Sequence, residues 1–391
     1  MLLPYNPAAL VDLTAELDRW KTQLDYRGVL PRTWAGRLRR DLEAEAVAAS
    51  TSMEGIPVTV EEVHRILAGD LPSKTKEADA ALVRGYRDAM SFVLRRADDV
   101  AFKWDRELLI GLHDRILAGN WASGAGRFRA GPAYVVDNRS SELRFEPPSP
   151  EAVPELVDTA CSVMQGRLQH PAIESAWIHA AVAAIHPFKD GNGRASRVAA
   201  SLAMYRGGFK LPEFTSLEEW WGRHLSDYYA AFRCLGGKFD PAADITPFIR
   251  AHLGAQLHQV RALDLRERVQ QRIWRAVEEA VAAAGLDLRV ANAVWDAFFG
   301  RSVTPRYYRP LAGVSPVTAS TDLGAAVAAG LLRPEGRARS RTYQAGDALY
   351  PRIGSAVGVE VRESGEFGRA IIIGELTKRV ASVGPISHHA G

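Results

Sequence analysis

Apolar residues recur at intervals of three and four along most of the first 262 positions, which is the spacing of amphipathic helices. Glycine, proline and polar clusters separate these segments, so the pattern predicts helices joined by loops. The expected helices lie near residues 8–25, 34–54, 60–68, 76–96, 105–118, 151–168, 172–185, 194–206, 217–234 and 242–262. We therefore expect a mostly α first domain, in which an N-terminal helical region (1–100) precedes a core (101–262).

Two short segments interrupt the helical pattern. Residues 133–136 and 143–145 are rich in β-branched and aromatic side chains, and they flank a polar, turn-rich stretch at 137–141. This arrangement predicts a small β-hairpin within the core.

From about residue 263 the pattern changes. Helices are predicted at 265–284, 290–299, 307–312 and 315–329, followed by a strand, a basic turn and a strand within 331–343. Successive helices that end in a hairpin are typical of a winged helix, a variant of the helix-turn-helix, so we expect such a domain at 263–350. Residues 351–391 are expected to form a tail, in which the apolar run 370–373 favours one strand.

Composition narrows the classes of protein that fit. Two cysteines, Cys161 and Cys234, are too few for a disulfide framework or a metal-ligand cluster and favour a reducing cytoplasm. No stretch approaches the length of a membrane span and no signal-like segment begins the chain, so no membrane partner is expected. The formal net charge of +3 gives no general argument for nucleic-acid binding.

The segment 186–197, His-Pro-Phe-Lys-Asp-Gly-Asn-Gly-Arg-Ala-Ser-Arg, carries the strongest chemical signal. It joins two helical runs, so its turn lies at a helix N-terminus, where unpaired backbone N–H groups and the helix dipole favour anions. Gly191 and Gly193 allow positive φ and a close approach of the backbone to a phosphate. Arg194 and Arg197 share one helix face and can bind neighbouring phosphates.

Two further side chains complete this constellation. Asp190 offers the hard oxygen ligand that Mg²⁺ prefers when it bridges a carboxylate and phosphates. His186 lies at the rim and is suited to act as a general base. The residues themselves therefore predict a nucleotide-phosphate site with a base beside it.

At every fixed position, this segment resembles the signature of the Fic family, His-Pro-Phe-x-Asp/Glu-Gly-Asn-Gly-Arg-x-x-Arg. The resemblance implies a mostly helical enzyme that transfers AMP from ATP to a hydroxyl group of a target protein and releases pyrophosphate. His186 would deprotonate the incoming Ser, Thr or Tyr hydroxyl, and Asp190 would bind Mg²⁺. The phosphate-binding set implied by position is Gly191, Asn192, Gly193, Arg194 and Arg197.

Within that set, the resemblance gives each side chain a role. Asn192 would contact the α-phosphate, Arg194 the β-phosphate and Arg197 the γ-phosphate. Phe188 would anchor the loop to the core.

A second motif lies upstream, at the end of the predicted helix 34–54. Ser50 and Glu54 stand four residues apart and precede Gly55, which fits the Ser/Thr-x-x-x-Glu-Gly/Asn pattern of the Fic inhibitory helix. The resemblance implies that Glu54 pairs with Arg197 and keeps this arginine from the γ-phosphate. The alternatives, a helix-end glutamate without a role and a glutamate that also helps to remove AMP from the target, stay open.

Two other regions match the family by position. The hairpin strand Ala133, Tyr134, Val135 and Val136 corresponds to the flap that aligns a target segment by strand addition, or else to an ordinary surface hairpin. Tyr228 and Tyr229 correspond to an aromatic pair that either flanks the adenine or packs in the core.

These observations predict an autoinhibited protein adenylyltransferase (AMPylator) that uses ATP and Mg²⁺, acts in the cytoplasm, and modifies a target protein and, in one version, itself. One alternative keeps the fold but uses another nucleotide or a phosphate donor. The other alternative is a DNA-binding regulator or toxin–antitoxin component, because four arginines lie in the predicted wing: Arg333, Arg337, Arg339 and Arg341. The target, and self-association into a homo-oligomer that controls the inhibitory helix, stay open.

Overall fold

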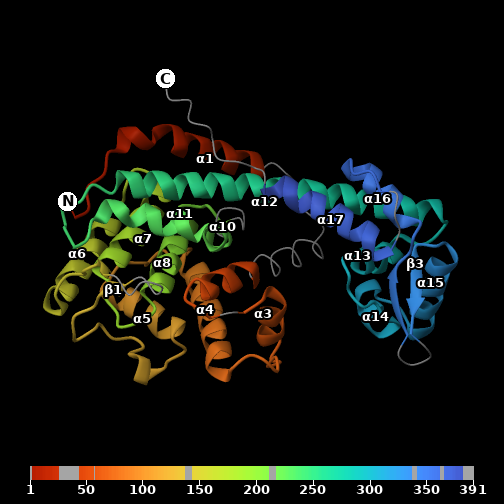
Figure 1. The fold of residues 1–391 in the computed structure, drawn as a ribbon, viewed down its shortest axis with the longest axis horizontal. Coiled ribbons are helices and arrows are strands. Elements are labelled where there is room, and N and C mark those ends of the chain that lie inside the picture. The colour runs from red at the N-terminus through yellow and green to blue at the C-terminus, as the bar shows by residue number, and fades with distance from the viewer. Residues whose placement is uncertain are drawn as a thin grey trace. The chain divides into compact units, whose positions relative to one another are not determined.

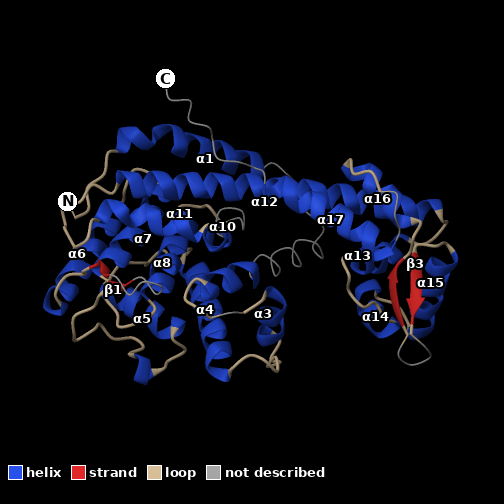
Figure 2. Ribbon diagram, viewed as in Figure 1, coloured by secondary structure: helices blue, strands red, loops and turns tan. Residues whose placement is uncertain are grey.

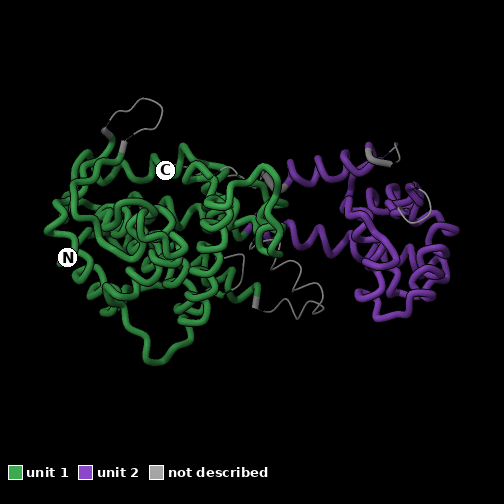
Figure 3. The backbone as a smooth tube through the Cα atoms, turned by 90° about the horizontal axis from the view of Figure 1, so that it is seen from below, with its two compact units in different colours: residues 1–260 green, residues 261–391 purple. Residues whose placement is uncertain are grey.

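The computed structural model describes residues 2–25, 44–56, 58–136, 143–210, 217–336, 341–361 and 365–381. Its backbone separates into two compact units, Met1–Val260 and Arg261–Gly391, which Figure 3 colours green and purple. We describe each unit by itself. Within the described residues, no helix combines the length and the apolar character needed to cross a bilayer.

The first unit is built almost entirely from helices (Figure 1). They are α1 (Val11–Asp25), α3 (Val60–Leu67), α4 (Glu77–Arg96), α5 (Arg106–Ile116), α6 (Val153–Gln165), α7 (Pro171–Ile185), α8 (Asn192–Arg206), α10 (Leu217–Arg223), α11 (Leu225–Ala231) and the start of α12 (Thr246–Ala283). Residues 44–52 are also helical and lead into a turn at 53–55. Residues 34–43 of the predicted helix 34–54 lie outside the described residues.

The centre of this unit is the pair α7 and α8, which pack against each other along their length, while α4 and α5 contact α8 from the other sides. Both helices of the pair are rich in alanine and are buried on nearly every face. Small side chains let the two backbones approach closely, so the turn that joins α7 to α8 is held by a rigid support. Trp177 in α7 is fully buried and donates its Nε1–H to the Leu3 carbonyl at 3.1 Å, which ties the N-terminal segment to this core.

A small antiparallel hairpin, β1 (Val135–Val136) and β2 (Leu143–Phe145), lies within the same unit. Val135 pairs with Phe145 and Val136 pairs with Leu143, as expected from the sequence pattern. The predicted turn at 137–141 lies outside the described residues. Where β2 ends, Glu146 exchanges backbone hydrogen bonds with Gly237 and Phe239, so this end of the hairpin is fixed to the helical body.

The second unit continues α12 and adds α13 (Ala291–Phe298), α14 (Pro305–Ala312), α15 (Pro316–Ala328), α16 (Leu349–Val357) and α17 (Gly365–Ala381). Two antiparallel strands, β3 (Leu332–Glu335) and β4 (Thr342–Ala345), form its hairpin, drawn red in Figure 2. The molecule is therefore mostly helical with two small hairpins, which confirms the predicted fold class. That α13, α14, α15 and the hairpin are a winged helix stays a prediction.

The structure differs from the sequence expectation in two places. The predicted helices 242–262 and 265–284 are one continuous helix, α12, because no glycine or proline separates them. The predicted strand 370–373 is wrong, and so is the uniform tail after 351, since α16 and α17 occupy much of that stretch. Ile372 and Leu376 are both buried and lie four residues apart, so the short apolar run belongs to a helical face.

Candidate active site

The turn between α7 and α8 is shaped by two left-handed residues. His186 ends α7 with φ 50° and ψ 57°, and its backbone N–H still donates to the Val182 carbonyl. Gly191 then precedes α8 with φ 77° and ψ 10°. The chain therefore reverses between two helices, and the first amides of α8, starting at Asn192, are presented at a helix N-terminus, the position that favours an anion.

The side chain of Asn192 holds this turn together. Its Oδ1 accepts from the Phe188 N–H at 2.9 Å and its Nδ2 donates to the Phe188 carbonyl at 2.8 Å. Phe188 is fully buried, as an anchor must be. The predicted contact of Asn192 with an α-phosphate stays a prediction, and we find its amide engaged with the loop.

Asp190 lies in the turn with 59% of its side chain exposed. Its Oδ1 accepts from the Gly191 N–H at 2.6 Å, and its Oδ2 lies 3.5 Å from Arg194 Nη2. Among the described residues no group of three or more His, Cys, Asp or Glu side chains could hold a metal ion. Asp190 nevertheless suits Mg²⁺, because this ion is commonly held by one or two carboxylates together with substrate phosphates and water.

Arg194, in the first turn of α8, is 2% exposed, yet two of its guanidinium nitrogens, Nε and Nη1, have no hydrogen-bond partner in the structure. Its one polar contact is the long one from Nη2 to Asp190. A buried cation without a partner is unfavourable. A phosphate group would supply the acceptors that this guanidinium lacks.

Arg197, one turn further along α8, is equally buried but fully engaged. Its Nε donates to Ser50 Oγ at 2.9 Å, and its Nη2 donates to the Ser50 carbonyl at 3.1 Å and to Glu54 Oε1 at 2.8 Å. Burial, the largest single effect, acts to lower the pKa of Arg197, but the Glu54 carboxylate together with Tyr228 and Tyr86 outweighs it, so the pKa is raised. The carboxylate also lies against Gly193, where an added Cβ would come within 2.4 Å of Glu54 Oε1.

His186 is half-buried at the edge of this cluster. Its Nδ1 lies 3.4 Å from the Ala183 carbonyl, which can only accept, so the proton of the neutral ring belongs on Nδ1 and Nε2 is the basic nitrogen. Burial lowers the pKa of His186, and the charge of Arg129 lowers it further. The imidazole is therefore neutral over a wide range of pH and available to accept a proton.

Comparison with known proteins identifies this region. The sequence profile of the Fic/DOC family matches residues 103–204, which include the hairpin, α7, the turn and the signature of α8. Residues 103–204 form a Fic domain.

Several relatives of this Fic domain are named adenylyltransferases. Protein adenylyltransferase fic-1 of Caenorhabditis elegans is 32% identical over 145 residues, which cover 36% of this chain and 25% of the relative. Protein adenylyltransferase Fic of Nematostella vectensis is 30% identical over 145 residues, which cover 36% of this chain and 30% of the relative. The match thus spans between a quarter and a third of the length of these relatives.

Solved structures extend the likeness in fold beyond the Fic domain. A Fic family protein from Desulfovibrio desulfuricans G20 superposes with a TM-score of 0.59 at 21% identity, and the match covers 88% of this chain and 98% of the other. A Fic-domain signalling protein from Bacteroides thetaiotaomicron gives a TM-score of 0.52 at 19% identity over 65% of this chain and 96% of its own. These similarities establish a common fold.

The Fic domain contains a further residue that holds the turn, and the motifs in the sequence do not point to it. His113 in α5 accepts at Nδ1 from the Gly126 N–H, 3.1 Å away, and its Nε2 lies 2.8 Å from the Asp190 carbonyl. Its ring stacks on Phe188 with centroids 3.7 Å apart. One tautomer satisfies both hydrogen bonds, so a neutral His113 fixes the turn that carries Asp190. The only sequence signal is a histidine on the apolar face of an amphipathic helix.

The two tyrosines of α11 lie in different surroundings. Tyr228 is buried in a cluster with Met53, Trp221 and Ala255, and its hydroxyl lies 3.1 Å from His179 Nε2. Burial is the main reason why the pKa of Tyr228 is raised to about 12. The charge of Arg197 opposes this rise, and the carboxylate of Glu54 adds to it. Tyr229 is 59% exposed. The structure therefore assigns Tyr228 to packing beside Met53, and of these two tyrosines only Tyr229 presents its ring to solvent.

The target-docking prediction rests on the hairpin strand. Tyr134 is 58% exposed, whereas Ala133 and Val135 are partly covered. That this strand aligns a target segment stays a prediction.

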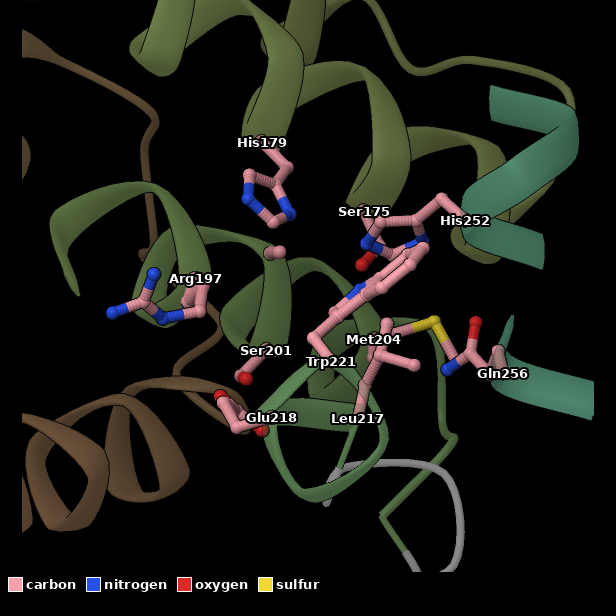
Figure 4. Close-up of a pocket in the computed structure, with 11 residues that line it drawn as sticks. Ser175, His179, Arg197, Ser201, Met204, Leu217, Glu218, Trp221, His252 and Gln256 are labelled. Atoms are coloured by element: carbon pink, nitrogen blue, oxygen red, sulfur yellow. The ribbon is translucent and has the colours of Figure 1, made fainter. Parts of the chain in front are cut away.

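Behind Arg197, a small cavity of about 20 Å³ lies between α7, α8, α10 and α12 (Figure 4). His179, Glu218, Trp221 and His252 each present to it at least one buried nitrogen or oxygen without a hydrogen-bond partner in the structure. Glu218 also accepts from the Tyr86 hydroxyl at 2.9 Å. Burial lowers the pKa of His252 to about 3, so this ring is neutral in the folded protein.

Proposed function

We propose that this chain is an autoinhibited protein adenylyltransferase that transfers AMP from ATP to a hydroxyl-bearing side chain of a target protein. One observation carries the proposal: Arg194, a buried guanidinium with two nitrogens unpartnered among the described residues, lies at the N-terminus of the helix that follows His186, a histidine whose pKa is lowered by burial. Such a site binds a polyanion and accepts a proton. The names of the relatives of the Fic domain support the choice of reaction.

Nucleotide binding follows from the charges and amides around the turn. The N-terminal amides of α8 and the free nitrogens of Arg194 would hold the phosphate chain of ATP. Asp190 would hold Mg²⁺, which supplies charge neutralisation to the phosphates when it is bound. The remaining requirement, a donor for the terminal phosphate, falls to Arg197 once its present partners release it.

The chemical step is a displacement at the α-phosphorus. The target hydroxyl oxygen forms a bond to this phosphorus as the bond to the β-phosphate bridging oxygen breaks, and pyrophosphate leaves. His186 Nε2 accepts the hydroxyl proton in the same step, and the turn amides stabilise the charge on the phosphoryl oxygens. The low pKa of His186 keeps the acceptor neutral before the reaction.

Autoinhibition rests on the contact between Glu54 and Arg197. The arginine uses Nε and Nη2 for Ser50 and Glu54, and the Glu54 carboxylate lies beside Gly193 in the first turn of α8. A γ-phosphate that approached Arg197 would be repelled by the negatively charged Glu54 carboxylate, which already occupies this contact. ATP is therefore held without productive alignment until Glu54 leaves.

Intact-mass spectrometry of the purified chain with Mg²⁺ and each of the four NTPs tests the proposal. We expect a single AMP adduct on the Glu54→Gly variant with ATP, little on wild type, and none on Glu54→Gly/His186→Ala. Ser52→Ala is the matched control, since Ser52 is exposed on the same helix and should leave the chain inhibited. An adduct from another NTP would change the donor, and the absence of any adduct in the presence of candidate targets would count against the transferase.

A second proposal concerns the second unit, which we propose binds duplex DNA. Gly313, with φ 65°, makes the turn between α14 and α15, as in a helix-turn-helix, and Arg333 and Arg341 are exposed on the following hairpin. The hydroxyls of Ser320 and Thr321 on α15 donate within their own helix, so phosphate contacts would dominate. Mobility shifts of a duplex at two salt concentrations test this: Arg333→Ala/Arg341→Ala should weaken binding and flatten its salt dependence. Salt-independent binding would favour a protein-docking role.

A further inference from the structure

Arg129 connects the segment after α5 to the turn that carries His186. Its backbone N–H donates to the Pro187 carbonyl at 2.9 Å, and its side-chain Nε donates to the His186 carbonyl at 2.8 Å. One residue therefore binds two consecutive carbonyls of the turn. Since His186 adopts the left-handed conformation that a non-glycine side chain rarely takes, its backbone needs such an external restraint.

The same guanidinium also binds both ends of the hairpin. Nη1 donates to the Gly131 carbonyl at 3.0 Å, four residues before β1, and Nη2 donates to the Pro148 carbonyl, three residues after β2. Arg129 is only 7% exposed, so these bonds form away from bulk water. The base and both ends of the β1–β2 hairpin are thus joined through one planar group.

The shape of this group matters as much as its charge. A guanidinium presents its donors in a fixed planar fork, whereas an ammonium is a compact point charge on a flexible stem. A lysine in place of Arg129 would keep the positive charge near His186 but would not reach three carbonyls in three directions. The two properties can therefore be separated by substitution.

We propose that Arg129 is a positioning residue that sets the distance between a target hydroxyl aligned on the β1–β2 hairpin and the Nε2 of His186. This inference rests on the proposed adenylyl transfer and on target alignment by the hairpin. Arg129 touches neither nucleotide nor target, and it acts by fixing the two elements that do.

Kinetics in the Glu54→Gly background test the positioning role. We expect Arg129→Lys to lower kcat for AMP transfer by about 10- to 100-fold, because a misplacement of about 1 Å costs on this order, with ATP affinity unchanged within twofold. Arg127→Lys is the matched control. Arg127 lies two residues away, and its side chain contacts the exposed Trp121: Nη2 donates to the Trp121 carbonyl at 2.9 Å, and the guanidinium stacks on the ring. It should leave kcat unchanged.

Titration of His186 by NMR separates the charge of Arg129 from its geometry and needs no activity. The charged groups that act on His186 are Arg129, which lowers its pKa, and Glu54 and Asp190, which raise it. Arg129→Gln should therefore raise the pKa of His186, while Arg129→Lys should leave it nearly unchanged. Hydrogen exchange of the Val135 and Phe145 amides should accelerate in both Arg129 variants and should stay unchanged in Arg127→Lys.

The outcomes distinguish this inference from the proposed function. If no nucleotide modifies the Glu54→Gly chain or a target, the transferase fails, but the titration and the hydrogen exchange still decide whether Arg129 joins His186 to the hairpin. If the Arg129 and Arg127 variants behave alike in kinetics, titration and exchange, the inference is wrong. Should Arg129→Gln fail to fold, Arg129→Lys carries the test through kcat and hairpin exchange.

Discussion

The first and second turns of α8 place two arginines on one face of the same buried helix, and their surroundings are opposite. In the first turn, Arg194 is buried with two nitrogens unpartnered. In the second turn, Arg197 is hydrogen-bonded to Ser50 and Glu54. These residues are distant in the sequence, since Ser50 precedes Arg197 by 147 positions.

The difference separates what the active-site turn does alone from what the rest of the chain imposes on it. The first turn is stabilised by near neighbours in the sequence, such as Asn192, and it keeps an open anion site. The second turn is closed by the helix 44–52 and the turn that follows it. Arg194 is a buried cation with two nitrogens unpartnered among the described residues and is therefore a candidate to bind an anionic ligand. Arg197 is a buried cation whose ligand position is already occupied by the Glu54 carboxylate.

The largest expected effect comes from the open turn. In the Glu54→Gly background, Arg194→Met should lower AMP transfer by about 10²- to 10³-fold, the usual result of removing a preorganised charge donor. Because the unpartnered guanidinium is itself unfavourable, the ligand-free variant should unfold at the same or a higher temperature than its parent. Calorimetry with and without ATP measures both. Retained transfer, or a clear loss of ligand-free stability, would remove the distinction between the two turns.

Substitution of Arg197, in the second turn of α8, should have the opposite effect on stability. Arg197→Met leaves Glu54 without its partner, and breaking a buried pair in this manner costs about 3 kcal/mol of folding free energy. Chemical denaturation of the single variants and of Glu54→Gln/Arg197→Met gives the coupling energy. If the losses of stability in the two single variants add up to the loss in the double variant, the coupling energy is zero and the pair contributes little.

Acid should lower the free energy of unfolding through His252, which lines the cavity behind Arg197. The folded-state pKa of His252 is about 3, well below the ordinary value for histidine. As pH falls from about 6.5 towards 3, the unfolded chain gains a proton that the folded chain refuses, so stability falls by about 1.4 kcal/mol per pH unit from this residue. His252→Gln should flatten the decline measured by urea unfolding between pH 6 and pH 4. His64→Gln, at a partly exposed position in α3, should leave the slope unchanged.

The smallest effect concerns one hydrogen bond of the inhibitory contact. Ser50→Ala removes the acceptor for Arg197 Nε, which is worth about 1 kcal/mol. In the otherwise wild-type chain, AMP transfer should rise by about fivefold. Rates measured beside Ser52→Ala check this, and a fall in transfer would mean that Ser50 supports the active arrangement instead.

The chemical roles assigned to residues from His186 to Arg197 stay predictions, but the sequence did predict a turn at a helix N-terminus with a left-handed Gly191, because these features depend on consecutive residues. It also predicted most helices, since their apolar spacing is a local property. The contacts of His113 and Arg129 with the turn were not predicted. These two residues lie 77 and 57 positions from their partners in the sequence, and they bind backbone carbonyls, which leave no pattern in the sequence. The run 370–373 was misassigned because a short apolar segment fits a buried strand or a buried helix equally well.

The contact of Glu54 with Arg197 has a thermodynamic consequence. A carboxylate attached to the same chain acts as a tethered ligand, at an effective concentration on the order of millimolar for a short flexible connection. Its occupancy does not depend on how much protein is present, but it does depend on how much nucleotide competes for Arg197. Nucleotide bound to Arg197 weakens the docking of the helix 44–52 by some factor. By reciprocity, a partner that removes this helix from Arg197 strengthens productive nucleotide binding by the same factor. In the proposed mechanism, Glu54 would therefore act as a built-in competitor of the nucleotide for Arg197.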